Sequence, residues 1–582
     1  MALYRSDQTQ LTFGAEPVPG GYTDPLLTDP AVQTSNPFST ALYLNANAGD
    51  TSIVVDAVTN AEVGQFILIG TDNSALASGS KSLEIRRIEN ISGTTNATIY
   101  LDAPLAHFHK ADQDVVEILA YPASGEYIRA NSFLPGVYDT VNLPEPSSAI
   151  NPSYFLGTEE KRAYTHAYRG AQSLEGSISS FAILNGWPLR FPIGKVESYG
   201  TSDGGNNSTL DTNDGEGVFE AKKGEYYIKL AATPAPDEVF NLGDSGTGDR
   251  EIRKIVARNG AYAQINYPLS FTHTNGGSAQ RVAANATTSA AGKYTHEITE
   301  TTELDTITWE ATFADSSGTA ANTLKRRYYG GMVGTSTLAA EEGGMLTMSW
   351  DSVPFMGMQH NIAEGHIGNT NLTAGVALPG HSLMHTDLQK AGVPSGSATG
   401  ETYPTTEPYY FSQGTIKMFD VVIAKVRDFS LNINNNLESR YYIEQRGDNR
   451  RRGPSQIHEG RREYTMTCTL VPDAIDATKI SAHTRNIFTE YLSQGDSSAF
   501  GTNSHMTGFS MELSFIRGKL ADADDGNDTI TITVPAADGQ KPGALLSTAP
   551  MQIDGNNPLQ VSAEILIRTL NITVVDNEPF YP

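Results

Sequence analysis

Five stretches of the sequence alternate apolar and polar residues with a period of two, the pattern of a strand with one buried face. Antiparallel sheets with one solvated face carry this alternation, whereas buried parallel strands are apolar throughout. We therefore predict a mainly β protein, an antiparallel β-barrel or sandwich with few helices. The apolar members are Ile307, Trp309, Ala311 and Phe313; Leu346, Met348 and Trp350; Tyr464, Met466, Cys468 and Leu470; Phe509, Met511, Leu513 and Phe515; Ile530, Ile532 and Val534.

The stretch AKVRDFSLNINNNLESRYYI, residues 424–443, changes its alternation partway. Apolar residues first occupy even positions, ending at Val426, and then odd ones, starting at Phe429. A shift of one residue turns every later side chain to the other face of a strand. This predicts a β-bulge or a crossing between two sheets. The polar positions that follow hold no nucleophile, base or ligand set: Asp428, Ser430, Asn432 and Asn434.

Composition sets the class of protein. The chain has 582 residues, enough for two to four domains, and 54 of them are Gly. Forty basic against 66 acidic residues give a net charge of −26, which argues against gripping DNA through its phosphates. Cys468 is the only cysteine, so no internal disulfide forms, and its place in an alternating strand predicts a core residue.

The amino terminus has no basic segment followed by an apolar run, and no stretch approaches eighteen apolar residues. We expect a soluble chain without signal peptide or membrane span. Helical patterns are few, and the best are THAYRG at 165–170 and TRNIFTEYLS at 484–493.

A pair of similar segments recurs in the same order. EIRRI at 84–88 and APLAHFH at 103–109 are echoed by EIRKI at 251–255 and YPLSFTH at 267–273. We predict two copies of one small β module at 36–125 and 197–287, after an N-terminal arm at 1–35. A polar glycine-rich stretch precedes the second copy, which favours its insertion into another domain.

Catalytic and metal-binding motifs are incomplete. GHSLM at 380–384 has Met384 where a nucleophile elbow needs glycine. A histidine-rich stretch lacks the spacing of a zinc site, and a loop with scattered imidazoles is the favoured interpretation; it contains His360, His366, His381 and His385. DADDGND at 522–528 resembles a calcium loop but fails its spacing, so a hairpin turn is favoured. We expect no cofactor, no metal and no enzymatic activity.

An arginine cluster lies between residues 446 and 462. In so acidic a protein it predicts an interface of ion pairs between protein subunits, since Arg binds carboxylates bidentately. A nucleic-acid patch and a solvated loop are the alternatives. Its members are Arg446, Arg450, Arg451, Arg452, Arg461 and Arg462.

Several segments resemble the tail tube proteins of long-tailed viruses of bacteria and archaea. They cover about 126–196 and 288–582, which we predict to be one discontinuous tail tube domain. The segments are YRGAQSLEGSIS at 168–179, YYGGMVGTSTLAAEEGGMLTMSWDSVPFMG at 328–357, PYYFSQGTIKM at 408–418, the stretch from 424 through NINNNLESRYYIEQRG, and IHEGRREYTMTCTL at 457–470.

This resemblance implies a structural virion protein. It would polymerise as stacked homo-hexameric rings, forming the tail tube through which the genome passes at ejection. Partners would be the tape measure protein and viral DNA in the lumen, with tail terminator and tail-tip proteins at the ends. The location would be the virion tail, assembled in the host cytoplasm.

Two other classes of function remain open. A virion adhesin would use the two repeated modules to bind glycans on aromatic platforms, for which Phe108 and Phe271 are the candidates. A calcium-dependent glycan-cleaving enzyme would need paired carboxylates, and no such motif stands out.

Overall fold

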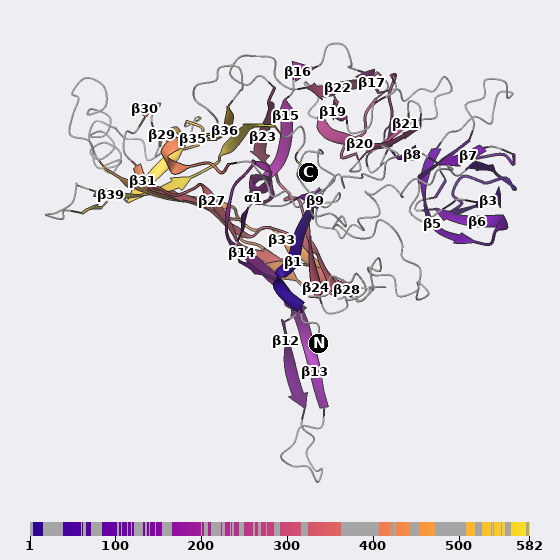
Figure 1. Ribbon diagram of the computed structural model, residues 1–582, viewed down its shortest axis with the longest axis horizontal. Helices are drawn as coiled ribbons and strands as arrows, with labels where there is room; N and C mark the ends of the chain where they lie inside the picture. The colour runs from indigo at the N-terminus through magenta and orange to yellow at the C-terminus, as the bar shows by residue number, and fades with distance from the viewer. Residues whose placement is uncertain are drawn as a thin grey trace, which may run out of the picture.

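In this computed structural model the chain folds almost entirely into antiparallel strands (Figure 1). The only α-helix among the described residues is α1 (Arg190–Ile193), preceded by a short 3-10 turn at Trp187–Leu189. The structure describes residues 4–15, 39–59, 61, 66–70, 84–101, 104–105, 108–112, 114–117, 119–120, 132–133, 137–138, 140–145, 147–153, 166–199, 201–202, 208–210, 221, 223, 227–232, 234, 238–243, 250–259, 262–265, 269–274, 276–283, 292–315, 324–361, 407–418, 421–422, 426–442, 453–471, 508–517, 527–536, 538, 541–548, 550–552, 560–577 and 581.

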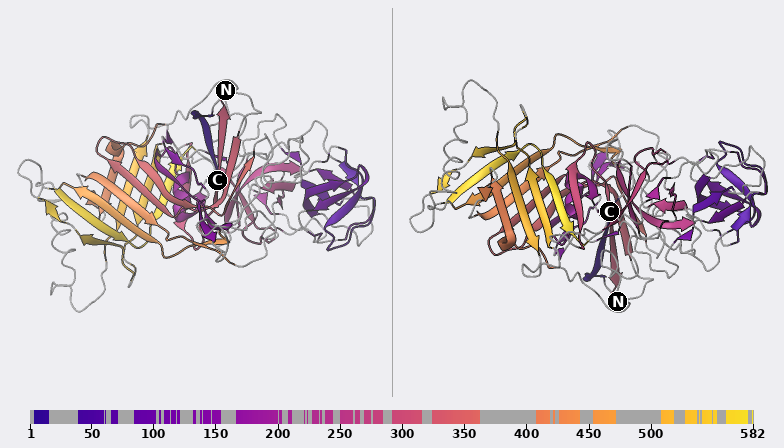
Figure 2. Two further views of the ribbon diagram at one scale, coloured as in Figure 1. Left: turned by 90° about the horizontal axis from the view of Figure 1, so that it is seen from below. Right: turned by 90° about the horizontal axis from the view of Figure 1, so that it is seen from above.

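The widest sheet has ten strands, which lie side by side in Figure 2. Its order is β10-β14-β27-β26-β31-β34-β39-β37, with β11 beside β14 and β38 beside β39. The bounds are β10 (Val137–Tyr138), β11 (Val141–Asn142), β14 (Glu175–Ala182), β26 (Thr335–Glu341), β27 (Thr347–Pro354), β31 (Val426–Asn434), β34 (Glu463–Leu470), β37 (Ala544–Thr548), β38 (Met551–Gln552) and β39 (Gln560–Ile567).

Two further sheets form a second layer. One has the order β28-β25-β24-β1-β9 and the other β15-β23-β40-β36-β35-β29-β30. Their bounds are β1 (Tyr4–Ala15), β9 (Ser132–Phe133), β24 (Ile307–Asp315), β25 (Leu324–Gly331) and β28 (Gly357–Asn361); then β15 (Gly194–Tyr199), β23 (Tyr294–Glu300), β29 (Gly414–Met418), β30 (Val421–Val422), β35 (Met511–Arg517), β36 (Asp528–Val534) and β40 (Asn571–Asp576).

One continuous apolar core joins the widest sheet to both sheets of the second layer. Around the first of them the core is aromatic, with the rings of Trp309 and Trp350 stacked 6.4 Å apart and Phe13 edge-on to both. Between β34 and β39 of the widest sheet and β35, β36 and β40 of the second layer, the core is mostly aliphatic, with Ile532 and Ile565 among its members. Among the described strands no sheet closes on itself, so the fold is a sandwich and not a barrel.

All five alternating stretches are strands, namely β24, β27, β34, β35 and β36, with their apolar positions buried except for the half-buried Phe313. The predicted change of face is also confirmed. The register between β31 and β34 shifts between Val426 and Asp428, where two residues of β31 oppose one of β34. Cys468 is buried in the core, as predicted.

The helix predicted at 165–170 is wrong. Residues from 166 form β13 (His166–Ser173), which pairs with β12 (Ser147–Ser153) in a hairpin that projects from the body (Figure 1). The partner strand lies far enough away in sequence that local propensity gave no sign of it. The helix predicted at 484–493 lies outside the described residues.

Two smaller sheets contain the repeated sequence segments. The first has the order β2-β7-β4-β5-β6-β3, and the second β16-β22-β19-β20-β21-β18 with β17 and β8 attached. Their bounds are β2 (Ser39–Ala41), β3 (Ser52–Ala57), β4 (Phe66–Ile69), β5 (Glu84–Ser92), β6 (Thr95–Leu101) and β7 (Asp114–Glu117); then β8 (Leu119–Ala120), β16 (Thr201–Ser202), β17 (Ser208–Thr209), β18 (Tyr227–Lys229), β19 (Val239–Leu242), β20 (Glu251–Asn259), β21 (Tyr262–Ile265) and β22 (Ser278–Ala283).

Their strand registers correspond residue by residue. Ile69 pairs with Glu84 in the first sheet, and Leu242 pairs with Glu251 in the second. The pairing of β5 with β6 shifts in register just after Ile88, the last residue of EIRRI. The pairing of β20 with β21 shifts just after Ile255, the last residue of EIRKI. Even the isolated bridges correspond, Ala46 with His109 and Ala221 with His273. Each sheet encloses its own apolar cluster. The boundaries 36–125 and 197–287 stay a prediction.

The shared segments supply buried polar contacts in each sheet. Arg86 donates from Nε and Nη2 to the Pro104 carbonyl, at 3.2 and 2.9 Å. In the second sheet Glu251 pairs with Arg253 and accepts from His273 Nε2 at 2.6 Å. The EIR segment and the segment ending in His therefore recur together because they meet in space.

Candidate assembly surface

The face of the widest sheet opposite the core is polar and almost free of basic residues. Six central strands, β14, β27, β26, β31, β34 and β39, hold six acidic residues and one basic residue, Arg427, which lies at the bulge. Polar side chains on this face include the acidic Glu175, Glu341, Asp351, Asp428, Glu463 and Glu564, and the uncharged Thr337, Thr347, Ser349, Ser430, Asn432, Thr465, Thr467, Thr469 and Ser562.

Hydrogen bonds between strands order part of this face. Thr337 Oγ1 donates to Asp351 Oδ2 at 3.0 Å, and Asn432 Nδ2 donates to Thr337 Oγ1 at 3.2 Å. These contacts cross from β27 through β26 to β31. The result is a surface made mostly of hydroxyl, amide and carboxylate groups, with Ala339 and the 44% exposed Leu566 as apolar members.

A buried polar cluster fixes β31 where it enters the Asn-rich turn. Asn435 is 1% exposed, and its Nδ2 donates to the carbonyls of Pro192 and Val333, at 3.0 and 2.9 Å. Its Oδ1 accepts from Arg462 Nε at 2.7 Å, and Arg462 also donates to the Ile193 carbonyl at 2.8 Å. The cluster therefore ties β31 and the start of β34 to α1.

The segment EGRRE supplies the other half of this cluster. The backbone N–H of Leu304 donates to Glu459 Oε1 at 2.5 Å, and Arg462 lies 3.9 Å from the same carboxylate. Burial raises the pKa of Glu459, an effect that the Leu304 bond and Arg462 partly offset. A Cβ on Gly460 would lie 2.5 Å from the Asn436 carbonyl oxygen, so only glycine fits there.

Sequence reasoning missed Asn435, although a pattern for it was present. Asn435 continues the odd-numbered positions of Phe429, Leu431 and Ile433, all of which face the core. A polar residue in a core-facing register must find hydrogen-bond partners, because an unpaired buried polar group costs free energy. The alternation alone therefore marks Asn435 as a buried hydrogen-bonding residue.

The structure divides the predicted arginine cluster. Arg446, Arg450, Arg451 and Arg452 lie outside the described residues. Arg461 is exposed, while Arg462 is half-buried and bound within its own chain. The predicted subunit interface of the cluster stays a prediction, and the hydrogen bonds of Arg462 to Asn435 and Ile193 lie within the chain.

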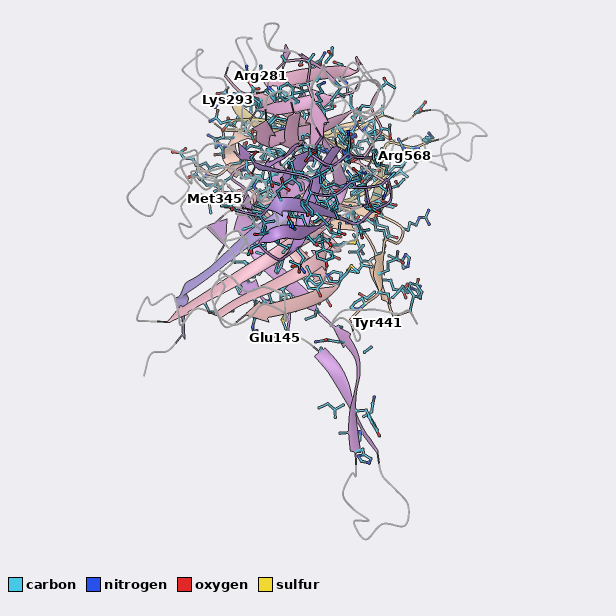
Figure 3. All side chains as sticks on the ribbon, turned by 90° about the vertical axis from the view of Figure 1, so that its right-hand side faces the viewer. Glu145, Arg281, Lys293, Met345, Tyr441 and Arg568 are labelled. Atoms are coloured by element: carbon cyan, nitrogen blue, oxygen red, sulfur yellow. The ribbon has the colours of Figure 1, made fainter. Side chains whose placement is uncertain are left out.

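Two hairpins lie at one end of the sandwich, where Figure 3 shows Tyr441 and Glu145 near the base of the longer one. The shorter hairpin consists of β32 (Glu438–Arg440) and β33 (Gln456–His458). Tyr441 donates from its hydroxyl to the Gln172 carbonyl of β13 at 3.2 Å, so the two hairpins are neighbours. Ile150 and Tyr168 on the longer hairpin are 64% and 60% exposed.

Most of the candidate catalytic and metal-binding residues lie outside the described residues. His366, His381, His385 and the GHSLM segment fall outside it, and His360 lies in β28. The described residues include no group of three or more His, Cys, Asp or Glu that could hold a metal ion. Asp528, the last residue of DADDGND, lies in β36 and pairs with Arg517 at 2.6 Å, while 522–526, where a hairpin turn is predicted, fall outside the described residues.

The proposed aromatic platforms differ in exposure. Phe108 is 43% exposed, whereas Phe271 is half-buried with Lys195 Nζ 5.7 Å from its ring centroid. No helix of the described residues is long and apolar enough to cross a membrane.

Comparison with known proteins gives one clear finding. A family model described as phage tail tube protein matches residues 8–565, nearly the whole chain. No curated protein matches the sequence.

Proposed function

Because the chain belongs to the phage tail tube protein family, we propose that its copies assemble into stacked rings forming a tail tube for genome passage. The polar face of the ten-stranded sheet lines the bore in this proposal. The observation that carries it is the composition of that face, with six acidic residues and only Arg427 basic on its six central strands. The ring of six that the resemblance predicts stays a prediction.

Electrostatics supports this orientation. DNA binds proteins largely through basic side chains that neutralise its phosphates and release counterions. A surface of hydroxyls and carboxylates offers no such contacts and repels the phosphates weakly. DNA can therefore move along this face without being held.

The two hairpins suit contact between successive rings. Exposed apolar side chains such as Ile150 and Tyr168, set on a projecting hairpin, favour a protein partner. The arginines at 446–452 lie in the sequence that connects β32 to β33, and Tyr441, which follows β32, contacts the longer hairpin. We propose that they pair with acidic groups of a neighbouring subunit.

The two small modules belong on the outside of the tube in this arrangement. The first lies in the chain between β1 and β9 and the second between β15 and β23, all four in the second layer. That layer covers the core side of the widest sheet, away from its polar face. Modules attached there leave a bore lined by the polar face clear.

Partners follow from this role. They would be further copies of the chain, the tape measure protein and DNA in the lumen, and tail terminator and tail-tip proteins at the ends. Assembly would take place in the host cytoplasm, and the role is structural without catalysis.

The test is a cryo-electron microscopy reconstruction of assembled protein, together with a variant lacking the second module. Tyr199 pairs with Thr295, so a short Gly-Ser turn can replace residues 200–291. We expect tubes with β31 and β34 at an unchanged bore and a narrower outer diameter. A monomer under all assembly conditions, or a polar face directed outward, contradicts the proposal.

A further inference from the structure

The sandwich contains one strand arrangement twice. In the first copy, apart from the strands of the two small modules and the pair β15 and β23, the chain order is β1, β9, β10–β11, β12, β13, β14, β24, β25, β26, β27, β28. In the second it is β29, β30, β31, β32, β33, β34, β35, β36, β37, β39, β40, with only β38 added. We name these sets the first repeat and the second repeat.

Every pairing within the first repeat has its counterpart in the second. In the widest sheet, β11–β14–β27–β26 corresponds to β31–β34–β39–β37. In the second layer, β9–β1–β24–β25–β28 corresponds to β30–β29–β35–β36–β40. The β12–β13 hairpin corresponds to β32–β33. All of these pairs are antiparallel, so the correspondence covers topology and direction together.

The two small modules obscure this duplication in sequence. The first is inserted between β1 and β9, whose counterparts β29 and β30 are separated by residues 419 and 420 alone. The second is inserted between β14 and β24. Both insertions thus fall within the first repeat.

The repeats meet along a strand pair in the widest sheet. Thr335 to Glu341 of β26 pair in continuous register with Asn434 to Asp428 of β31. Within the widest sheet, the edge strand of the first repeat, β26, therefore pairs with the edge strand of the second repeat, β31. This seam shows how one tube repeat joins the next.

The outer edges of the sheet are the counterparts of the two strands in that seam. β37 corresponds to β26 and ends the sheet on one side, while β10–β11 corresponds to β31 and ends it on the other. Phe509 bridges the outer edge of β37 at Ala544, and no described strand lies beyond 545–548. Unpaired strand edges are templates for pairing with another chain.

Resting on the proposed tube function, we infer that copies join head to tail by pairing β37 of one copy with β10–β11 of the next. Each chain then contributes two repeats to the ring. A ring of six repeats contains three chains and not six.

The strand count makes this seam possible. Each repeat contributes four strand positions to the widest sheet, an even number, so the direction of its first strand recurs in the next repeat. β37 and the β10–β11 edge of the next copy consequently meet antiparallel, as β26 and β31 do. A heterologous contact of this kind closes into a ring when its rotation allows.

The second layer points to the same neighbours. The outer edge of β40, in the second repeat, is covered by β23, which lies between β14 and β24 of the first repeat. The counterpart edge on β28 has no described strand beyond it. In a head-to-tail ring that edge faces the second repeat of the preceding copy, the same copy that contributes β37.

Paired cysteines test the seam in assembled tubes. Ser547 and Thr548 on the β37 edge are exposed, as are Thr140 and Asn142 on the β10–β11 edge. Four double variants combine one Cys from each edge, since directly opposed residues of an antiparallel pair can form disulfides. After oxidation and denaturation, we expect at least one variant to give chains linked in a ladder that stops at three.

The control variant carries Ala339→Cys and Ser430→Cys, which are opposed across the seam inside the chain. It should link within one chain and give no ladder. Single-cysteine variants at 547 or 142 show the background of chance linkage.

The mass of single wild-type rings, measured by native mass spectrometry, gives the chain count without any substitution. Rings of six chains, a ladder that reaches six, or intact tubes with no inter-chain link in all four variants overturn the inference. In the first of these outcomes the proposed tube function survives. Failure to form any ring overturns both.

Discussion

Replacing Asn435 by Ala should destabilise the chain by about 3 kcal/mol, because the side chain makes three hydrogen bonds in a place that water does not reach. Removing it leaves the carbonyls of Pro192 and Val333 and the Nε of Arg462 without this partner. A buried polar group left unsatisfied costs about 1–3 kcal/mol. Because Arg462 keeps its bond to the Ile193 carbonyl, we expect the summed cost of the three lost bonds to lie near the lower end of its range.

The geometry also predicts the effect of the isosteric change. Asn435→Asp keeps an acceptor for Arg462 but replaces the donating Nδ2 by an oxygen that faces two carbonyl oxygens. We expect Asp to destabilise at least as much as Ala. A role limited to binding the Arg462 cation would instead make Asp neutral or stabilising.

The assay is urea unfolding followed by tryptophan fluorescence, at concentrations where the chain is monomeric. The matched control is Asn432→Ala, on the polar face of the same strand, where one bond to Thr337 is lost and water can replace it. Its expected cost is below about 1 kcal/mol. If Asn435→Ala lies within about 0.5 kcal/mol of wild type, the buried cluster does not tie β31 and the start of β34 to α1 with the strength that its contacts predict.

Three further outcomes are expected. Burial alone would raise the pKa of Glu251, but its bonds to His273, Arg253 and Ser270 hold that pKa below its ordinary value of 4.5. The resulting stability is present above about pH 4.5 and is lost as the pH falls through the lower folded pKa; urea unfolding should show this loss in wild type and a flatter profile in Glu251→Gln. Burial raises the pKa of Cys468 to about 12, so its thiol should react with iodoacetamide only after unfolding, and modification of native protein would contradict its core position. Reversing the three arginines at 450–452 to Glu should block tube assembly while the far-UV circular dichroism of the monomer is unchanged, and normal tubes would exclude them from a subunit contact.

The sequence predicted those elements whose alternation is local. The period of two located β24, β27 and β34, and the shift after Val426 located a bulge that the pairing with β34 reproduces. The strand β13 at 166–173 was missed because it belongs to a two-stranded hairpin outside the core, where no buried face imposes an alternation of apolar and polar residues. What fixes β13 is its pairing with β12, which is not a property of either segment alone.

The duplicated sandwich was not visible in the sequence for a different reason. Corresponding strand pairs bury different side chains: Trp309 in β24 pairs with Tyr328, whereas Leu513 in β35 pairs with Ile532. Cores tolerate such exchanges when total volume and patterning are kept, so the fold persists while motifs diverge. The small modules kept recognisable motifs because Arg86 and Arg253 are buried polar residues, whose partners restrict substitution more tightly than apolar contacts do.

The duplication gives a physical reason for inserting both modules into the first repeat. In a tube of identical single repeats, any insertion is copied at every position around the ring, and bulky neighbours compete for the same exterior space. A chain with two repeats can place its insertions in one of them and keep the other compact, as the two residues between β29 and β30 show. The pairing of β8, which follows the strands of the first module, with β20 of the second then brings the two modules of one chain into contact although they are far apart in sequence. In the proposed ring of three chains, the outside of the tube shows three pairs of modules, one on each first repeat, alternating with three second repeats that carry no module. All six repeats place a β-sheet toward the bore.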